Sequence, residues 1–212
     1  MFVHYELRTT DPGAAARFYG DLLGWEVVTY PGGAAFRSAD VALGGASRTN
    51  PGVPPHWTGF IRVSDVDGAA SAAASAGGIV TAPPVDIPGF GRLSVVLDAQ
   101  RAVVGFVSAG AAPAELAVPH IGAIELHTPD VATAAAFYGA VVGWTLGPDG
   151  FLGSDGAPVA GIRVSEAASW LPQLFVPAVE PVATRAAALG GAVEDGVLRD
   201  PQGAVLALRV AA

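Results

Sequence analysis

Short segments in which apolar and polar residues alternate recur along the chain, with Ala-rich segments of helical character between them. Val3–Leu7 and Gly122–Leu126 are predicted strands. Asp11 and Asp130 follow them as candidate helix N-caps, and Pro12 suits a first helical position because its missing N–H has no partner there. Each predicted helix closes at a glycine, and a tryptophan opens the next strand.

The same order returns after each of these segments. Strands are predicted over 57–63 and 171–176, and helices over 67–76 and 181–189, each helix followed by Gly-Gly. Three short strands then complete each block, at 79–81, 92–97 and 102–107, and at 192–194, 196–199 and 204–210. The pattern predicts the order strand–helix–strand–strand–strand four times.

The chain is internally duplicated. Residues 6–25 align with residues 125–144 at an offset of 119, and 11 of these 20 positions are identical. Residues 56–80 parallel 169–193, and 96–106 parallel 197–208 loosely, with Asp98 opposite Asp200. The duplication predicts two domains, 1–109 and 120–212, joined by a linker at 110–119.

Composition narrows the classes of function. Of 212 residues, 51% are hydrophobic and 14% are charged, and the formal net charge is -8. All 11 basic residues are arginine, so no basic stripe is expected for nucleic acid or an anionic membrane. Cysteine is absent, which excludes thiolate nucleophiles and disulfides. No signal peptide or membrane span is expected, and a cytoplasmic location is predicted.

Four βαβββ units in two pairs, with an E-L-x-T-x-D start and an F-Y-G…G-W helix exit, resemble one family. Asp200–Ala204 also matches its D-P-Q-G-A turn, whereas Asp98–Ala102 lacks the proline and the glycine. The chain resembles the tandem-domain branch of the glyoxalase / bleomycin-resistance protein / extradiol dioxygenase (vicinal oxygen chelate, VOC) superfamily. The resemblance implies an α+β fold in which two βαβββ modules form a curved mixed sheet around a cup-shaped cavity.

The resemblance also implies a divalent metal held by His, Gln or Glu on the first, fourth, fifth and eighth strands. His4 matches the first-strand position. The fourth strands, near 41–45 and 158–164, contain none of these residue types. The remaining positions carry residues without a suitable donor set, namely Ala123, Thr58, Leu171, Gly105 and Ala207. Because such a metal needs three or more converging ligands, we expect no cofactor; a divalent metal around His4 stays open.

Strand alternation predicts which side chains face each cup, since residues two apart share a face. In the first half these are His4, Glu6, Arg8, Thr58, Phe60 and Arg62. In the second half they are Glu125, His127, Leu171, Gln173 and Phe175, with Arg209 on the last strand. Each cup is therefore expected to be a mostly apolar small-molecule site with a few polar groups.

Each candidate has a functional and a structural interpretation. Glu6 is a candidate base or a structural partner of Arg62. His4 is a residual metal ligand, a general base or a polar residue at a strand start. Arg8 and Arg62 either hold an anion or neutralise Glu6.

The other aromatic and histidine positions favour structural roles. His127 replaces Arg8 in the second copy and favours a surface or structural role. His56 and His120 are expected in loops. Trp57 and Trp170 favour core packing over stacking on a ligand.

Two functions remain in competition. The first is a metal-independent protein that binds an apolar or aromatic small molecule in one or both cups. The alternative is a lyase, isomerase or dioxygenase-type enzyme that uses Glu6 or His4, with Arg62 or Arg8 as anion anchor, so enzyme status stays open. A purely structural second domain is a third possibility. The duplication allows a monomer that contains its own pseudo-dimer, or a homodimer.

Overall fold

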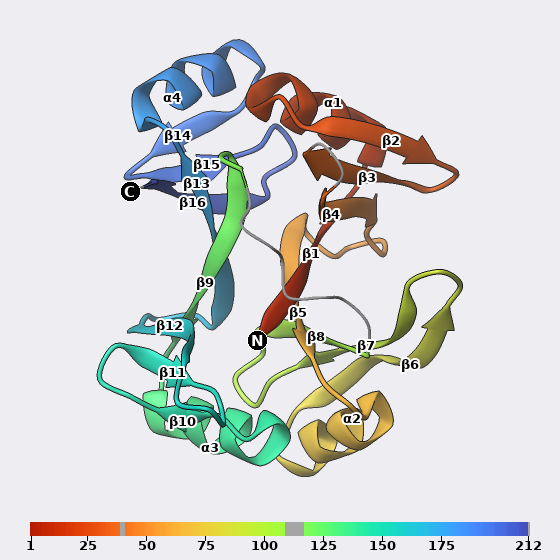
Figure 1. Cartoon of the computed structure of the whole chain (residues 1–212), viewed down its shortest axis with the longest axis vertical. Helices are drawn as coiled ribbons and strands as arrows, with labels where there is room; N and C mark the ends of the chain where they lie inside the picture. Colours follow the sequence, from red (N-terminus) through yellow and green to blue (C-terminus); the bar gives the residue numbers. More distant parts are fainter. Residues whose placement is uncertain (39–40, 109–116, 212) are drawn as a thin grey trace. The chain divides into compact units, whose positions relative to one another are not determined.

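The computed structural model describes residues 1–38, 41–108 and 117–211, in which the predicted βαβββ order occurs four times (Figure 1). Module 1 consists of β1 (Phe2–Thr9), α1 (Pro12–Leu23), β2 (Glu26–Tyr30), β3 (Gly33–Ser38) and β4 (Val41–Arg48). Module 2 consists of β5 (His56–Arg62), α2 (Val66–Ser75), β6 (Ile79–Ile87), β7 (Gly91–Leu97) and β8 (Val103–Val107).

The second half of the sequence repeats this plan with shorter strands. Module 3 consists of β9 (His120–Thr128), α3 (Val131–Val142), β10 (Thr145–Leu146), β11 (Gly150–Leu152) and β12 (Pro158–Val164). Module 4 consists of β13 (Ser169–Val176), α4 (Val179–Ala188), β14 (Ala192–Glu194), β15 (Val197–Arg199) and β16 (Val205–Val210). Of the predicted strands, 79–81 differs most from the structure, since β6 continues to Ile87.

Each half of the sequence forms one eight-stranded mixed sheet. The strand orders are β2-β3-β4-β1-β5-β8-β7-β6 and β10-β11-β12-β9-β13-β16-β15-β14. The pairs β1–β4 and β9–β12 are parallel, whereas β3–β4 and β11–β12 are antiparallel. The predicted α+β fold, with two βαβββ modules to a sheet, is confirmed.

The helix boundaries follow the expected chemistry. The Asp11 carboxylate accepts a hydrogen bond from Ala14 N at 3.0 Å, and Asp130 accepts two at the start of α3. Gly24 and Gly143 end α1 and α3 with φ of 69°, a left-handed conformation that glycine adopts without a steric penalty. The predicted caps at Asp11 and Asp130 are confirmed.

Contacts divide the chain into two compact units that each draw on both halves of the sequence. One unit contains α2 and β6–β8 of module 2 together with α3 and β10–β12 of module 3. The other contains α1 and β2–β4 of module 1 together with α4 and β14–β16 of module 4. In Figure 1, α2 lies beside α3 and α1 beside α4. The domain limits 1–109 and 120–212 stay a prediction, and residues 110–116 of the predicted linker lie outside the described residues.

An aromatic cluster forms the core of each unit. Tyr19 packs against Trp25 and Trp57, with ring centroids 6.1 and 5.3 Å apart. Tyr138 packs in the same way against Trp144 and Trp170, at 5.6 and 5.4 Å. All of these side chains are buried. Trp57 and Trp170 therefore belong to the core, as the sequence favoured.

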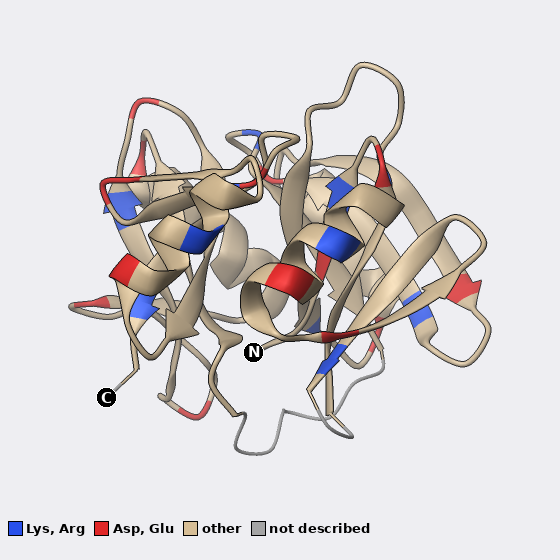
Figure 2. Cartoon of the chain, turned by 90° about the horizontal axis from the view of Figure 1, so that it is seen from above, with Lys and Arg blue, Asp and Glu red and all other residues tan. Residues whose placement is uncertain are grey.

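Charged residues are sparse on this scaffold. Figure 2 shows most of the ribbon uncharged, with arginine and acidic positions interspersed. Within the described ranges, the structure has no helix long and apolar enough to cross a membrane.

Candidate functional site

The repeated F-Y-G and D-x-Q motifs meet in a buried hydrogen-bonded chain within one unit. Asp200 Oδ1 accepts hydrogen bonds from the backbone N–H groups of Gln202 and Ala204, at 2.8 and 3.0 Å. Its Oδ2 accepts one from the Tyr19 hydroxyl, which in turn accepts one from Trp57 Nε1, both at 3.2 Å. Burial raises the pKa of both Tyr19 and Asp200 above their usual ranges.

The other unit contains the same chain with exchanged partners. Tyr138 donates to Asp98 Oδ2 at 3.0 Å and accepts from Trp170 Nε1 at 2.7 Å. Asp98 Oδ1 accepts from the N–H groups of Gln100 and Ala102, at 2.8 and 2.9 Å. Burial raises the pKa of Asp98, and these hydrogen bonds oppose that rise.

The turn glutamines hold the start of the opposite helix. Gln202 Oε1 accepts from Thr9 Oγ1 at 2.6 Å and from Asp11 N at 2.8 Å, and its Nε2 donates to Asp11 O. Gln100 contacts Thr128 and Asp130 in a similar way: its Nε2 donates to Thr128 Oγ1 at 2.6 Å and to Asp130 O at 2.8 Å, and its Oε1 accepts from Asp130 N at 2.9 Å. The motifs that identify the sequence thus join module 1 to module 4 and module 2 to module 3. Their role is architectural.

The first-half candidate His4 lies among aromatic rings. Its ring centroid is 5.6 Å from that of Phe60 and 4.9 Å from that of Phe90, both in edge-on geometry. Phe60 on β5 is paired with Gly105 on β8. A Cβ atom built on Gly105 would lie only 2.2 Å from Cδ1 of Phe60. The Phe60 ring therefore fills the space that a side chain at the implied eighth-strand ligand position would need.

The residues present do not fit the metal that the fold family implies. His4 is the one His, Gln or Glu at the tested positions, and the rings of Phe60 and Phe90 lie edge-on to it. In the described ranges, His and acidic side chains form no group of three or more that could hold a metal ion. We therefore derive no chemical step through a metal.

Glu6 and Arg8 of β1 lie against β4. A Cβ atom built on Gly45, the residue paired with Glu6, would lie 2.5 Å from Glu6 Oε2, so the carboxylate lies across the glycine. Arg8 donates from Nη1 to Ser47 Oγ at 2.7 Å and from Nη2 to the carbonyl oxygen of Arg48 at 2.5 Å. The roles of Glu6 as base and of Arg8 as anion anchor stay predictions.

In the second half, the structure brings Glu125 and His127 together with a residue that the sequence did not single out. His127 Nε2 lies 3.0 Å from Glu125 Oε1, and Arg163 Nε donates to the same oxygen at 2.9 Å. Arg163 lies on a fourth strand, where the implied metal site concerns only His, Gln and Glu, so the sequence does not single it out. No local signal points to it, because only the β9–β12 register, which pairs Arg163 with His127, brings the arginine to Glu125.

Other predicted residues have less polar surroundings. Thr58 is buried, and Gln173 on β13 is half-buried and paired with Ala207 on β16. The ring of Phe175 stacks on His120, with centroids 5.6 Å apart. His56 and His120 are the first residues of β5 and β9, so the expectation that both lie in loops is wrong. In each case the strand begins directly after the proline-rich stretch.

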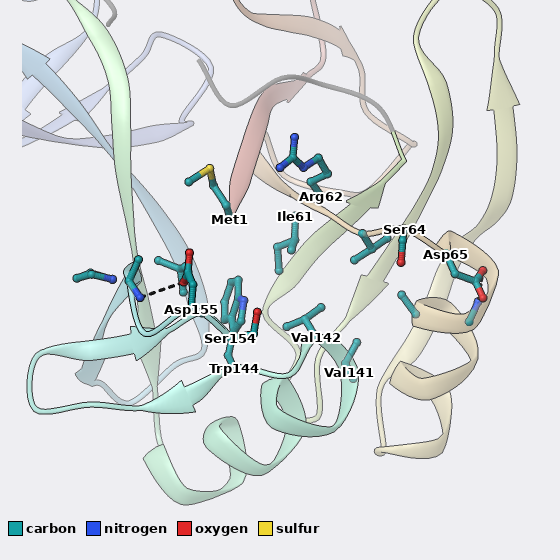
Figure 3. A pocket seen from close by; sticks show the side chains of 17 residues that line it. Met1, Ile61, Arg62, Ser64, Asp65, Val141, Val142, Trp144, Ser154 and Asp155 are labelled. Carbon is teal, nitrogen blue, oxygen red and sulfur yellow. Dashed lines mark hydrogen bonds between the residues drawn. The ribbon is translucent and has the colours of Figure 1, made fainter. Parts of the chain in front are cut away.

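A cleft of about 600 Å³ lies in the unit that contains modules 2 and 3 (Figure 3). The apolar part of its lining includes Trp144, Ile61 and Val142. The charged side chains that line the cleft include Arg62 and Asp155. Arg62 is the one predicted site residue in its lining, which contains no histidine. The cleft therefore differs from the predicted cup faces.

The chain has the architecture of a tandem VOC-type protein, with four βαβββ modules in two eight-stranded sheets. Most positions at which this fold would carry a metal ligand hold other residue types. The family model of the "Glyoxalase/Bleomycin resistance protein/Dioxygenase superfamily" matches residues 1–105. The "Putative glyoxylase CFP32" of Mycobacterium tuberculosis is 30% identical, covering 96% of this chain and 92% of that protein. The "Anthracycline biosynthesis protein DauV" of a Streptomyces species is also 30% identical, with 94% and 85% covered. The chain belongs to this superfamily.

Solved structures share the fold of the whole chain. The Mn(II)-bound glyoxalase from Novosphingobium aromaticivorans has a TM-score of 0.65 at 18% identity, covering 99% of this chain and 81% of that one. Homoprotocatechuate 2,3-dioxygenase from Arthrobacter globiformis has a TM-score of 0.69 at 15% identity, covering 99% and 79%. At these identities the likeness concerns the fold alone.

Proposed function

We propose that this chain binds an apolar or aromatic small molecule on the cup face of one or both sheets, without a metal ion. The observation that carries the proposal is the placement of Phe60 against Gly105, beside His4 and Phe90. The Phe60 ring fills the space at Gly105, the eighth-strand position at which the resemblance implies a metal ligand. Such a surface favours a flat apolar ligand through burial and edge-on or stacked ring contacts.

The similarity to the Streptomyces relative supports the same class of ligand. Its printed name assigns it to anthracycline biosynthesis. Anthracyclines are fused-ring aromatic compounds, which match an apolar face that carries only a few polar groups. We extend this class of ligand, and not a particular compound, to the present chain.

The direct test is a titration with anthraquinone-2-sulfonate, which has no chelating hydroxyl pair, followed by calorimetry with EDTA present and again with added Mn²⁺. We expect the same Kd under both conditions, because no metal takes part. Phe60→Ala should weaken binding by about 10-fold to 100-fold, since it removes a large apolar contact. Val164→Ala, which shortens an exposed side chain on the face of β12 opposite to that of Arg163, is the control and should leave Kd unchanged. Binding that disappears with EDTA and returns with Mn²⁺ would overturn the proposal.

An enzyme is the second candidate, because relatives of this chain are named as glyoxylases. In its first-half form, Glu6 or His4 would transfer a proton while Arg62 or Arg8 held an anion. Metal analysis of the purified protein separates the metal-dependent form of this idea from the binding protein. Stoichiometric Mn, Fe, Ni or Zn would favour the metalloenzyme.

A further inference from the structure

Three polar side chains of the second sheet form a compact cluster on β9 and β12. Glu125 and His127 are two residues apart on β9, so they share a face of the sheet. Arg163 on β12 is paired with His127, and Gly161 is paired with Glu125. Glu125 Oε1 contacts both His127 Nε2, at 3.0 Å, and Arg163 Nε, at 2.9 Å. All of these residues belong to one compact unit.

The three side chains of the cluster differ in how far they are exposed to solvent. Their exposed fractions are 16% for Glu125, 24% for His127 and 63% for Arg163. A Cβ atom built on Gly161 would approach the Glu125 side chain to 3.3 Å, so the carboxylate lies flat across that glycine. The carboxylate is therefore the enclosed member, and the cationic group reaches toward solvent.

The hydrogen bonds within the cluster leave His127 Nδ1 and the terminal amino groups of Arg163 available to contact a bound molecule. If His127 donates its Nε2 proton to the carboxylate, Nδ1 carries the lone pair, and the carboxylate would stabilise the imidazolium formed on proton uptake. Among the described residues, His127 Nδ1 has no hydrogen-bond partner and is not a buried unpaired atom. Arg163 engages Glu125 through Nε, and both of its terminal amino groups have no partner in the described part of the chain.

We propose that this cluster is a metal-free proton-transfer site for an enolisable aromatic ketone. His127 Nδ1 removes a proton from the carbon next to the carbonyl group. The electron pair of the broken C–H bond forms the C=C bond of the enolate, and the carbonyl π pair moves to oxygen. The terminal amino groups of Arg163 donate hydrogen bonds to that oxyanion. Return of the proton to carbon completes an exchange or an isomerisation with no oxidant or reductant.

The first half lacks this arrangement. At the position equivalent to His127 stands Arg8, whose amino groups donate to Ser47 and to the carbonyl oxygen of Arg48. Ser47 is paired with Arg8 just as Arg163 is paired with His127. Two residues after the repeated glutamate, the second sheet thus carries a histidine paired with a solvent-directed arginine, where the first sheet carries Arg8 paired with Ser47. This contrast assigns the second half a chemical role, where the sequence also allowed a purely structural one.

The test is deuterium exchange into 2-tetralone in D₂O with EDTA present, followed by NMR, alongside calorimetric binding of the same ketone. We expect the wild-type protein to accelerate exchange over buffer. His127→Gln should lower the enzymatic rate about 100-fold while keeping a donor to Glu125, and Arg163→Gln should lower it about 10-fold. His56→Gln and Arg17→Gln, the latter at an exposed arginine on α1, are the matched controls and should retain the wild-type rate.

Glu125 is a positioning residue in this scheme, so its variant needs a readout other than rate. The ¹⁵N shifts of the His127 ring report which nitrogen carries the proton, and the His127→Gln spectrum assigns them. We expect the wild-type ring to be protonated at Nε2, and Glu125→Gln to redistribute that proton between the two nitrogens. Unchanged ring shifts in Glu125→Gln would contradict its role.

The inference rests on the proposed function, because it needs a small molecule on the second cup face, and the paired measurements separate the two. Binding of 2-tetralone without accelerated exchange overturns the proton-transfer site and leaves the binding proposal standing. Absence of both overturns both for this class of ketone. Exchange that survives His127→Gln, or that requires added metal, also overturns the site.

Discussion

The two buried Trp–Tyr–Asp chains allow one perturbation to be made twice in the same molecule. Tyr138→Phe and Tyr19→Phe each remove a single hydroxyl that accepts from a tryptophan N–H and donates to an aspartate. The aromatic rings stay in place, so the core volume hardly changes. Each variant therefore isolates the hydrogen bonds of one unit.

The expected loss in the free energy of unfolding depends on the groups that lose their hydrogen bond when the hydroxyl is removed. In Tyr138→Phe, the indole N–H of Trp170 loses its acceptor inside the core, which costs about 1–3 kcal/mol. Asp98 loses one donor but keeps the N–H groups of Gln100 and Ala102. We expect a loss of about 3 kcal/mol in the free energy of unfolding. The longer bonds of Tyr19, both 3.2 Å against 2.7 and 3.0 Å, predict a smaller loss of about 2 kcal/mol.

Urea unfolding followed by far-UV circular dichroism at neutral pH measures both values. Tyr30→Phe, at a half-exposed tyrosine on β2, is the control and should change stability little. A loss below about 0.5 kcal/mol in Tyr138→Phe would refute the reasoning. So would a larger loss in Tyr19→Phe than in Tyr138→Phe.

Three further perturbations test the same structure. Gln202→Ala removes the side-chain bonds to Thr9 and Asp11 and should cost about 2–3 kcal/mol, measured as a lower midpoint in thermal unfolding; an unchanged midpoint would show that these bonds do not join modules 1 and 4. Gly105→Ala should cost about 1–3 kcal/mol because its Cβ meets the Phe60 ring, and a double-mutant cycle with Phe60→Ala should recover much of that loss; simple additivity would contradict the contact. Burial raises the pKa of Asp98, so its contribution to stability is present below the unfolded-state pKa and is lost as pH rises through the folded-state pKa. The stability of the wild type relative to Asp98→Asn should therefore fall as pH rises from acid to neutral in urea titrations, and a rise would refute the assignment.

Much of the fold is visible in local sequence chemistry. Asp11 and Asp130 cap their helices where predicted, because a carboxylate before an Ala-rich segment has few better partners than the free N–H groups. The end of β6 was not predicted, since Pro83 and Pro84 indicate a loop, yet residues on both sides pair with β7. The propensities of single residues do not predict such a pairing between strands.

The candidate site was predicted only in part, because periodicity gives a face and not a partner. Strand alternation placed Glu125 and His127 together, and they are hydrogen-bonded. Their arginine comes from β12, 36 residues after His127, and only the register of the parallel pair brings it there. Likewise, the placement of Phe60 over Gly105 depends on the β5–β8 register, which no local pattern encodes.

The duplication itself separates architecture from function. Identical positions such as Thr9 and Thr128, or Tyr19 and Tyr138, are buried, and each is bonded to a turn from the opposite half of the sequence. Since the Tyr19 hydroxyl needs Asp200 and the Tyr138 hydroxyl needs Asp98, neither half satisfies its own tyrosine, and both copies of these motifs must be kept.

The glutamate of the repeat is the exception. Glu6 and Glu125 are identical positions on the predicted cup faces, but the residues around them differ: Arg8 and Ser47 in one sheet, His127 and Arg163 in the other. A buried network constrains every member at once, because one loss strands its partners, whereas a residue on an open face can change alone. The change from Arg8 to His127, with Arg163 in place of Ser47, is the difference between the copies on which the proposed proton-transfer site rests.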